Sequence, residues 1–432
     1  MVAEQKERDA STCPKSRAEF NDVFIPHPIA HIYLNFRLET LALESKAVAD
    51  LVRFDERMRN YPYRSALLKS LKRAESIATV RTDGIHPEVE QILLFEVAAR
   101  LGKAKPRGQK EFVRKTAANS DIKNCEASFE AYRCMKALDY IMDVKPGQRK
   151  LTRDDIVELQ RLCVRGTRRE VFANLRKDDG KTEYYPSTSK VAYCPPKADQ
   201  IIYLLDDLIE FSNREDISPL IRAIIAHFQL EAIQPYSEGL DRLGRMFALL
   251  IMRNTGIFEN IIPPFSITPA VQTRHHTEYL IPYRTGQSFE RHDVMPALDK
   301  WVEHSSRATD RSVKYAEIYR RRIKEIVNGW RQRLGDAYGS ASLDTLLSEL
   351  PGSPILSAAD ATAFIDRSYQ TANECVSRLV EIDILRPINS TKRNRLFRSD
   401  DMLSMLQEIE AAFMPEKAIP REDFYSPRIY LS

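Results

Sequence analysis

Residues that could bind a phosphate chain gather in one short run, from Gln234 to Arg245. A helical pattern stops there at a proline, an acidic loop follows, and a new helical pattern opens with Arg242 and Arg245. Two arginines three positions apart lie on one face of a helix, and near its N-terminus they suit a polyphosphate. Glu238, just ahead of them, could hold an accompanying magnesium ion. The alternative is a plain helix-loop-helix with surface arginines, and the pattern alone leaves both interpretations open.

The elements that must position this run are mainly helical. Apolar residues recur at helical spacing and predict helices over Leu38–Met58, Tyr63–Val80, Pro87–Leu101, Cys125–Met142, Arg153–Val164, Lys197–Phe211, Pro219–Leu230 and Asp241–Met252, with a helix pair over Val294–Val327. The segment Phe172–Pro196 alternates aromatic and polar residues and ends in two prolines, which predicts a short β-hairpin. Residues 1–22 predict a flexible tail. The run Pro351-Gly352-Ser353-Pro354 is typical of a linker, and we place a domain boundary there.

Composition limits the classes of function. The chain has 432 residues, 43% hydrophobic and 29% charged, which excludes a fibrous repeat or a chain that is disordered throughout. Its formal net charge of +4 is too small for the whole molecule to bind nucleic acid nonspecifically. The six cysteines form no CxxC pair, so reduced thiols and a cytoplasmic location are expected. No export signal is visible and no apolar run is long enough to span a bilayer, so no membrane partner is expected.

The run from Gln234 to Arg245 resembles the motif of the Fic family, HPF-x-[DE]-GNGR-x-x-R, which lies between two helices of an all-helical domain. Residues ahead of it also fit, namely His227, Phe228, Glu231 and Ile233. The resemblance implies a relative of protein adenylyltransferases, which use ATP and Mg²⁺ to transfer AMP to a Ser, Thr or Tyr hydroxyl of a protein. It also implies roles for five positions: Gln234 at the place of the catalytic base, Glu238 as the metal ligand, Gly239 as the loop glycine, and Arg242 and Arg245 as phosphate contacts.

Three positions depart from the motif. Gln234 stands where a histidine base is expected, and an amide cannot take up a proton near neutral pH. Leu240 and Asp241 replace the asparagine and the second glycine, which removes a phosphate contact and places a carboxylate at the helix N-terminus. Asp241 could act there as a substitute anion that excludes nucleotide. We therefore expect a degenerate member, a pseudoenzyme with weak or absent AMP transfer.

The helix end around Thr79, Asp83 and Gly84 is similar to the family's inhibitory pattern, [ST]-x-x-x-E-[GN]. In the family, the acidic residue of this pattern pairs with the second arginine of the motif, here Arg245, and blocks the γ-phosphate site. Asp83 is one methylene shorter than the usual glutamate. An ordinary helix C-terminus, with Gly84 just past its end, is the alternative.

The predicted hairpin matches the place of the family's flap, which binds target segments by strand addition. The resemblance places Val191 and Tyr193 on the pairing strand. Packing roles are the alternative for the neighbouring tyrosines, Tyr184 and Tyr185.

The last part of the chain predicts a second kind of domain. The segment Ile355-Leu356-Ser357 opens a short helix over Ala358–Ile365; a turn, a helix over Ser368–Glu381 and a basic two-strand segment over Ile384–Phe397 follow. This order is typical of a winged helix-turn-helix, a module that often follows the Fic domain in bacterial family members. The expected DNA contacts are Tyr369, Gln370, Thr371 and Asn373 on the second helix, and Lys392, Arg393 and Arg395 in the basic segment. A winged helix that binds protein is the alternative.

The sequence thus predicts a mainly α protein in four parts: a tail (1–22), an N-terminal helical region with the inhibitory segment (23–120), a Fic core with trailing helices (121–350), and a winged helix with a C-terminal tail (351–432). Three functions are compatible with it. The first is a degenerate AMP-transferase relative, and the second is a DNA-binding transcriptional regulator with the Fic domain as scaffold. The third is an active nucleotidyl or phosphoryl transferase with an unconventional base. The sequence does not identify a target protein, and a homodimer is a candidate assembly.

Overall fold

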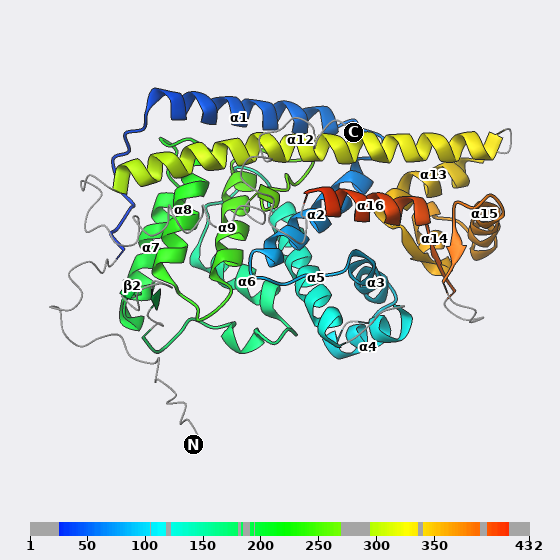
Figure 1. Cartoon of the computed structure of the whole chain (residues 1–432), viewed down its shortest axis with the longest axis horizontal. Helices are drawn as coiled ribbons and strands as arrows, with labels where there is room; N and C mark the ends of the chain where they lie inside the picture. The colour runs from blue at the N-terminus through cyan, green and yellow to red at the C-terminus, as the bar shows by residue number, and fades with distance from the viewer. Residues whose placement is uncertain are drawn as a thin grey trace, which may run out of the picture. The chain divides into compact units, whose positions relative to one another are not determined.

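The computed structural model describes residues 26–103, 105–117, 122–179, 183–184, 191–193, 195–268, 294–335, 340–388 and 395–413. Most of these residues lie in helices, which confirms the predicted mainly α class (Figure 1). The chain divides into two compact units. The first contains residues 1–48, 143–257 and 274–307, and the second contains residues 49–142, 258–273 and 308–432.

The first unit is built around α6 (Arg153–Val164), α7 (Ile201–Ser212), α8 (Pro219–Ile233) and α9 (Leu240–Asn254). Helix α8 contacts both α7 and α9, and α6 packs on α9 (Figure 1). Every residue of α8 from Leu220 to Ile233 is buried, as expected for a helix that is apolar nearly all round. Short 3₁₀ turns, η1 (Glu170–Phe172) and η2 (Ala198–Gln200), lead into and out of the hairpin region. The central helix α8 therefore ends directly at the motif.

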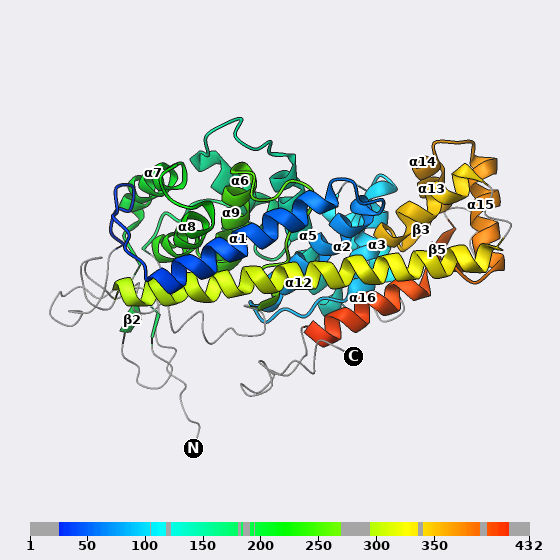
Figure 2. The ribbon, with the colours of Figure 1, turned by 90° about the horizontal axis from the view of Figure 1, so that it is seen from above.

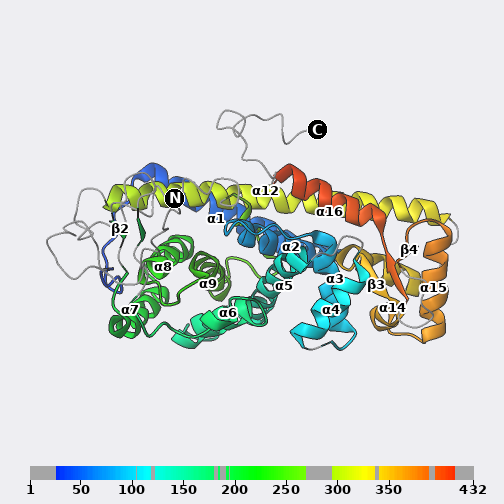
Figure 3. The ribbon, with the colours of Figure 1, turned by 60° about the horizontal axis from the view of Figure 1, so that its bottom comes forward.

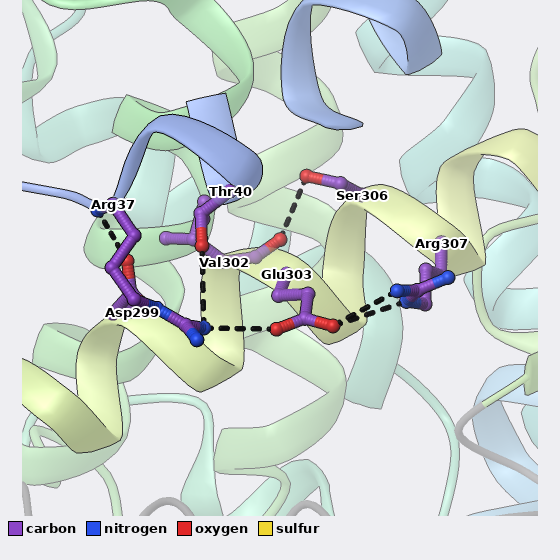
Figure 4. Close-up of polar contacts among 7 residues, drawn as sticks. All are labelled: Arg37, Thr40, Asp299, Val302, Glu303, Ser306 and Arg307. Atoms are coloured by element: carbon purple, nitrogen blue, oxygen red, sulfur yellow. Dashed lines mark hydrogen bonds and ion pairs between the residues drawn. The ribbon is translucent and has the colours of Figure 1, made fainter. Parts of the chain in front are cut away.

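The beginnings of two long helices, α1 (Leu38–Met58) and α12 (Val294–Leu334), are tied together in the first unit (Figure 4). Arg37 donates its backbone N–H to Asp299 Oδ1 at 3.0 Å and its Nη2 to Glu303 Oε2 at 3.0 Å. Its Nε also pairs with Asp299 Oδ2. Arg307, one helical turn further along α12, donates its Nη2 to Glu303 Oε1 at 3.0 Å. This network fixes the start of α12 against the start of α1.

The predicted helix pair over Val294–Val327 is wrong, because α12 continues as one helix of 41 residues to Leu334. No glycine or proline occurs between Ala297 and Asn328 that could end it. Ion pairs one turn apart, such as Lys314 with Asp310 at 2.8 Å, support its exposed face.

The predicted hairpin is confirmed as two short antiparallel strands, β1 (Glu183–Tyr184) and β2 (Val191–Tyr193). Glu183 is paired with Tyr193, and Tyr184 with Val191. Residues 185–190, which include Tyr185, and Cys194 lie outside the described residues.

The second unit contains α2 (Arg64–Arg81), α3 (Val89–Arg100), α4 (Pro106–Thr116) and α5 (Ile122–Asp143, without its last residue). Helix α4 was not predicted from the sequence, because Val113 is the one apolar side chain that it buries. It forms by packing on α3 (Figure 3). An aromatic cluster links α3 to α5, with the ring of Phe95 5.0 Å from that of Phe129 and 5.6 Å from that of Tyr132.

The last part of the second unit contains α13 (Ala341–Glu349), β3 (Ile355–Ser357), α14 (Ala358–Ile365), α15 (Tyr369–Glu381), β4 (Arg386–Pro387), β5 (Leu396–Arg398) and α16 (Asp400–Phe413) (Figure 2). The bounds predicted for α14 are confirmed. The segment Ile355–Ser357 was expected to open that helix, but it is a strand that pairs with β5, giving an antiparallel sheet of order β3-β5-β4. Helices α13 and α16 were not predicted.

The interpretation of Pro351-Gly352-Ser353-Pro354 as a linker is wrong. Its first two residues belong to a 3₁₀ turn, η4 (Leu350–Gly352), and the whole segment is buried. The turn packs on α2, where a Cβ added to Gly352 would lie 2.8 Å from Ala66 Cα. Arg73 Nη2 also donates to the Gly352 carbonyl. The domain boundaries themselves stay a prediction.

The described part of the chain bears on two expectations from composition, the one on disulfides and the one on membrane-spanning helices. The cysteines there (Cys125, Cys134, Cys163 and Cys375) form no disulfide with one another. Within the same residues, no helix combines the length and the apolarity needed to cross a bilayer.

Candidate functional site

Helix α8 stops at Gln234 in a left-handed conformation, with φ 48° and ψ 59°. The Gln234 N–H still donates to Leu230 O at 3.1 Å, and the side chain is buried. A left-handed conformation costs a residue with a Cβ about 1–2 kcal/mol, so surrounding contacts must hold it. Pro235 follows directly and cannot continue the helix.

Arg176 supplies those contacts. Its Nε donates to Gln234 O at 2.6 Å and its Nη2 to Pro196 O at 2.5 Å, both in buried positions. Its Nη1 donates to Asp178 O at 2.8 Å, and its backbone N–H donates to Pro235 O at 3.0 Å. One buried guanidinium therefore ties the end of α8 to the segment after the hairpin, and we call these contacts the Arg176 clamp.

The loop between α8 and α9 turns at Gly239, whose φ of 79° is open to glycine without strain. Gln160 of α6 holds this loop, because its Nε2 donates to Glu238 O at 3.3 Å and to Phe172 O at 3.1 Å. The Glu238 carboxylate is 40% exposed, and its Oε2 lies 3.2 Å from Arg169 Nε. The expected metal ligand thus lies at the rim of the site and already has a cationic partner.

Arg242 and Arg245 are both buried on α9. Arg245 Nη1 donates to Asp241 Oδ1, one helical turn earlier. The expected phosphate ligand Arg245 is therefore paired with a carboxylate from the position where the family motif has glycine.

His227 lies behind this pair. Its Nε2 is 2.7 Å from Glu231 Oε1 and 3.7 Å from Asp241 Oδ1. Burial by itself lowers the pKa of His227, but the two carboxylates outweigh burial and raise that pKa above its ordinary value. The imidazole fits because Gly244 has no side chain: a Cβ there would lie 2.3 Å from His227 Cδ2.

Tyr236 stands at the phenylalanine position of the motif, and its ring is buried. Burial raises the pKa of its hydroxyl. Among the described residues, the hydroxyl oxygen has no hydrogen-bond partner. The ring therefore serves the core as phenylalanine would, and the extra oxygen is a cost.

The segment predicted to be inhibitory belongs to the second unit. Thr79 is buried, and its Oγ1 donates to Ser266 Oγ at 2.8 Å. Ser266 in turn donates its N–H to Glu75 Oε2 at 2.8 Å. Asp83 is partly exposed, and Gly84 follows with φ 73° at the end of the helix. Pairing of Asp83 with Arg245 stays a prediction.

The residues expected to contact DNA lie at the start of α15. Tyr369 is 61% exposed and Gln370 is also exposed, whereas Thr371 and Asn373 are partly buried. Thr371 donates its N–H to the Ser368 hydroxyl at 3.2 Å, so it belongs to the helix cap. The guanidinium of the exposed Arg395 lies 5.3 Å from the centre of the Phe397 ring. Lys392 and Arg393 lie outside the described residues.

Sequence reasoning missed Arg176, Gln160 and Gly244. No local pattern marks Arg176 or Gln160, because they act on the motif across 58 and 78 positions of the chain. The contact of Gly244 with His227 also depends on how two helices cross. The pairing of Arg245 with Asp241, by contrast, was detectable, since an i, i+4 acid–base pair in the first turn of a helix is a local signal.

Part of the chain that contains this site is similar to known proteins. Residues 150–252 match the family model described as Fic/DOC family. The chain is 27% identical over 124 residues to protein adenylyltransferase fic-1 of Caenorhabditis elegans, a match that covers 28% of this chain and only 22% of the worm protein. A Fic family protein from Desulfovibrio desulfuricans has 16% identity and a TM-score of 0.47, covering 83% of this chain and 95% of its own. Fic-1 of C. elegans has 19% identity and a TM-score of 0.38, covering 64% and 73%.

Proposed function

From the premise that the chain is a Fic-family protein, with its Fic domain at residues 150–252, we propose that its AMP-transfer activity is weak or absent. The observation that carries this proposal is the ion pair between Arg245 and Asp241. In the family motif this guanidinium binds phosphate. Here a carboxylate from the same helix is already paired with it.

This ion pair opposes nucleotide binding in two ways. A phosphate would have to replace a charge-assisted hydrogen bond to Arg245, whose side chain is only 7% exposed. It would also lie beside the Asp241 carboxylate. Two like charges about 4 Å apart repel by about 4 kcal/mol at the effective dielectric constant near a protein surface, or about three decades of affinity.

The base position adds a second obstacle. An amide at Gln234 cannot accept a proton, and loss of a positioned base costs about 10²- to 10⁴-fold in rate. The clamp by Arg176 nevertheless keeps the backbone at this position in its turn. The proposed protein thus retains the scaffold of the site without its general base.

The donors present do not fit ATP and Mg²⁺ in this arrangement. Arg245 is paired with Asp241, and Glu238 is 3.2 Å from Arg169. Mg²⁺ in nucleotide sites is held by one or two carboxylates together with the phosphates, so its binding depends on a phosphate that Asp241 disfavours.

The test compares the wild type with Asp241→Gly and with the triple variant Gln234→His, Leu240→Asn, Asp241→Gly. Thermal melts are recorded with and without millimolar ATP and Mg²⁺, and transfer of labelled AMP to proteins of a cell lysate is measured. We expect no melting shift for the wild type. We expect a shift for Asp241→Gly, because binding at 100 times Kd stabilises by about 2.7 kcal/mol. Labelling is expected only from the triple variant. Asp216→Gly, which removes an exposed carboxylate, is the matched control.

Equal labelling by the wild type and the triple variant would refute the proposal. If that labelling disappeared in Arg245→Ala, the function would instead be an active transferase with an unconventional base. A wild type that binds ATP without labelling any protein would show that Asp241 does not close the site, which also contradicts the argument.

A second candidate function is DNA-binding regulation by the last part of the chain, with the Fic domain as scaffold. We infer a winged helix there from the succession of α14, α15 and two strands in a sheet of order β3-β5-β4. The exposed Tyr369 and Gln370 at the start of α15 support a role in base or phosphate contacts. Two arginines of the sheet are partly neutralised, since Arg386 and Arg398 lie 3.2 and 2.7 Å from Asp400.

Mobility of random duplex DNA at low salt tests this second function. We expect a salt-sensitive shift at nanomolar to micromolar protein that Tyr369→Ala and Gln370→Ala weaken. Glu381→Ala, at the exposed far end of the same helix, is the control, because it removes a negative charge away from Tyr369 and Gln370 and should not weaken binding. Unchanged mobility at low salt would exclude DNA as the partner.

A further inference from the structure

We propose that His227, Glu231 and Asp241 form a binding site for a divalent transition-metal ion such as Zn²⁺. The ligand atoms are one imidazole nitrogen and one oxygen from each carboxylate. These atoms all lie within 4.8 Å of one another. The site is separate from the rim position of Glu238 and does not depend on nucleotide binding.

The backbone brings the ligands together. His227 and Glu231 are one turn apart on α8, and Asp241 lies in the first turn of α9, which packs on α8. Ligand atoms around a tetrahedral zinc ion, at about 2.0–2.1 Å from it, are about 3.3 Å from one another. The observed separations from His227 Nε2, 2.7 Å to Glu231 and 3.7 Å to Asp241, lie on either side of that value. Small side-chain rotations are therefore sufficient to admit an ion.

Burial and charge also suit a cation. His227 and Glu231 side chains are 9% and 3% exposed, whereas that of Asp241 is 31% exposed. An ion would therefore enter past Asp241, and a water molecule on that side could complete its coordination. Two carboxylates face the ion, and one of them, Asp241, also shares its negative charge with the Arg245 guanidinium. A carboxylate offers about four lone-pair sites, so Asp241 can bind an ion while it keeps Arg245 as a partner.

The orientation of the imidazole is set by its packing. On one side the ring lies against α9 at Gly244, where a Cβ would be 2.9 Å from Nε2. The ring of Trp301 is also close, edge-on, with centroids 6.4 Å apart. Ligand imidazoles in metal sites need this kind of fixed orientation. Gly244 thus acts as a positioning residue for the site.

The donor set selects the class of ion. Imidazole nitrogen combined with carboxylate oxygen suits zinc and related transition ions, whereas Mg²⁺ and Ca²⁺ prefer oxygen ligands alone. We therefore expect Zn²⁺ and Co²⁺ to bind this cluster, and Mg²⁺ at the same concentration not to compete.

The experiment titrates chelator-treated full-length protein with Zn²⁺ by calorimetry, and with Co²⁺ by visible absorption. We expect one saturable site whose Co²⁺ spectrum lacks thiolate charge-transfer bands, which distinguishes it from binding by cysteine. Asp241→Asn and Glu231→Gln should each weaken Zn²⁺ binding at least tenfold. Gly244→Ala should do the same by displacing His227.

His31→Gln is the matched control. His31 also lies close to a carboxylate, 3.4 Å from Glu210, but both side chains are largely exposed, at 88% and 60%. This variant should bind Zn²⁺ as the wild type does. Far-ultraviolet circular dichroism verifies the fold of each variant, and Asp241→Asn is chosen as isosteric and partly exposed. Absence of saturable binding in the wild type, or binding that Asp241→Asn and Glu231→Gln leave unchanged, would overturn the proposal.

Discussion

Replacing Arg176 with methionine should destabilise the protein by about 3 kcal/mol. The variant keeps most of the buried stem but loses the guanidinium that holds Gln234 O at 2.6 Å and Pro196 O at 2.5 Å. Hydrogen bonds from a charged donor contribute about 1.5–3 kcal/mol each, so two of them give a gross loss of about 3–6 kcal/mol. Part of this loss is recovered, because the variant no longer buries a charge. Arg176→Lys should recover only part of the stability, since an ammonium lacks the planar fork.

Urea unfolding followed by circular dichroism measures the change. Amide hydrogen exchange over the stretch around Gln234 should accelerate at the same time, because the clamp holds that backbone. The control is Arg161→Met, which removes an ion pair with Glu158 from a guanidinium side chain that is 43% exposed and should cost less than about 0.5 kcal/mol. A loss below about 0.5 kcal/mol for Arg176→Met, or equal losses for both variants, would refute the clamp.

Four further substitutions have effects of defined sign. Tyr236→Phe removes a buried hydroxyl that has no partner among the described residues. The free energy of unfolding should therefore increase by about 1 kcal/mol, and the melting temperature should rise. A clear decrease in melting temperature would contradict this expectation. The carboxylates raise the pKa of His227 in the folded state, so its charge stabilises the fold below the unfolded pKa, and this effect disappears as pH rises through the folded pKa. The destabilisation by His227→Asn should therefore be larger near about pH 6 than near about pH 9 in thermal melts, and equal values would contradict this sign. Gly352→Ala should destabilise the protein by about 1–3 kcal/mol in urea unfolding, since the added Cβ would meet Ala66. Gly329→Ala in α12 has open space around it and should stabilise the protein by about 0.5–1 kcal/mol in the same assay. The reverse order would be inconsistent with the packing.

Local signals in the sequence were sufficient for much of the fold. The bounds of α6 and α14 agree with the prediction to the residue, because each helix follows a Thr or Ser that caps it. Helix α4 has too few apolar residues for its periodicity to reveal it, and packing on α3 decides its structure. The buried turn at Gly352 was mistaken for a linker, because proline and glycine mark both kinds of segment and only the contact with α2 separates them.

The same division applies to the site. The sequence by itself determined that a run similar to the Fic motif is present, that glutamine stands at the place of the motif histidine, and that a carboxylate stands one turn before Arg245, because each depends on residue type and helical spacing. Only the tertiary structure decided that Arg176 holds the end of α8, and that His227 and Asp241 come within 3.7 Å of each other over Gly244. These contacts join residues far apart in the chain. Their geometry depends on how the helices pack, and periodicity carries no information about packing partners.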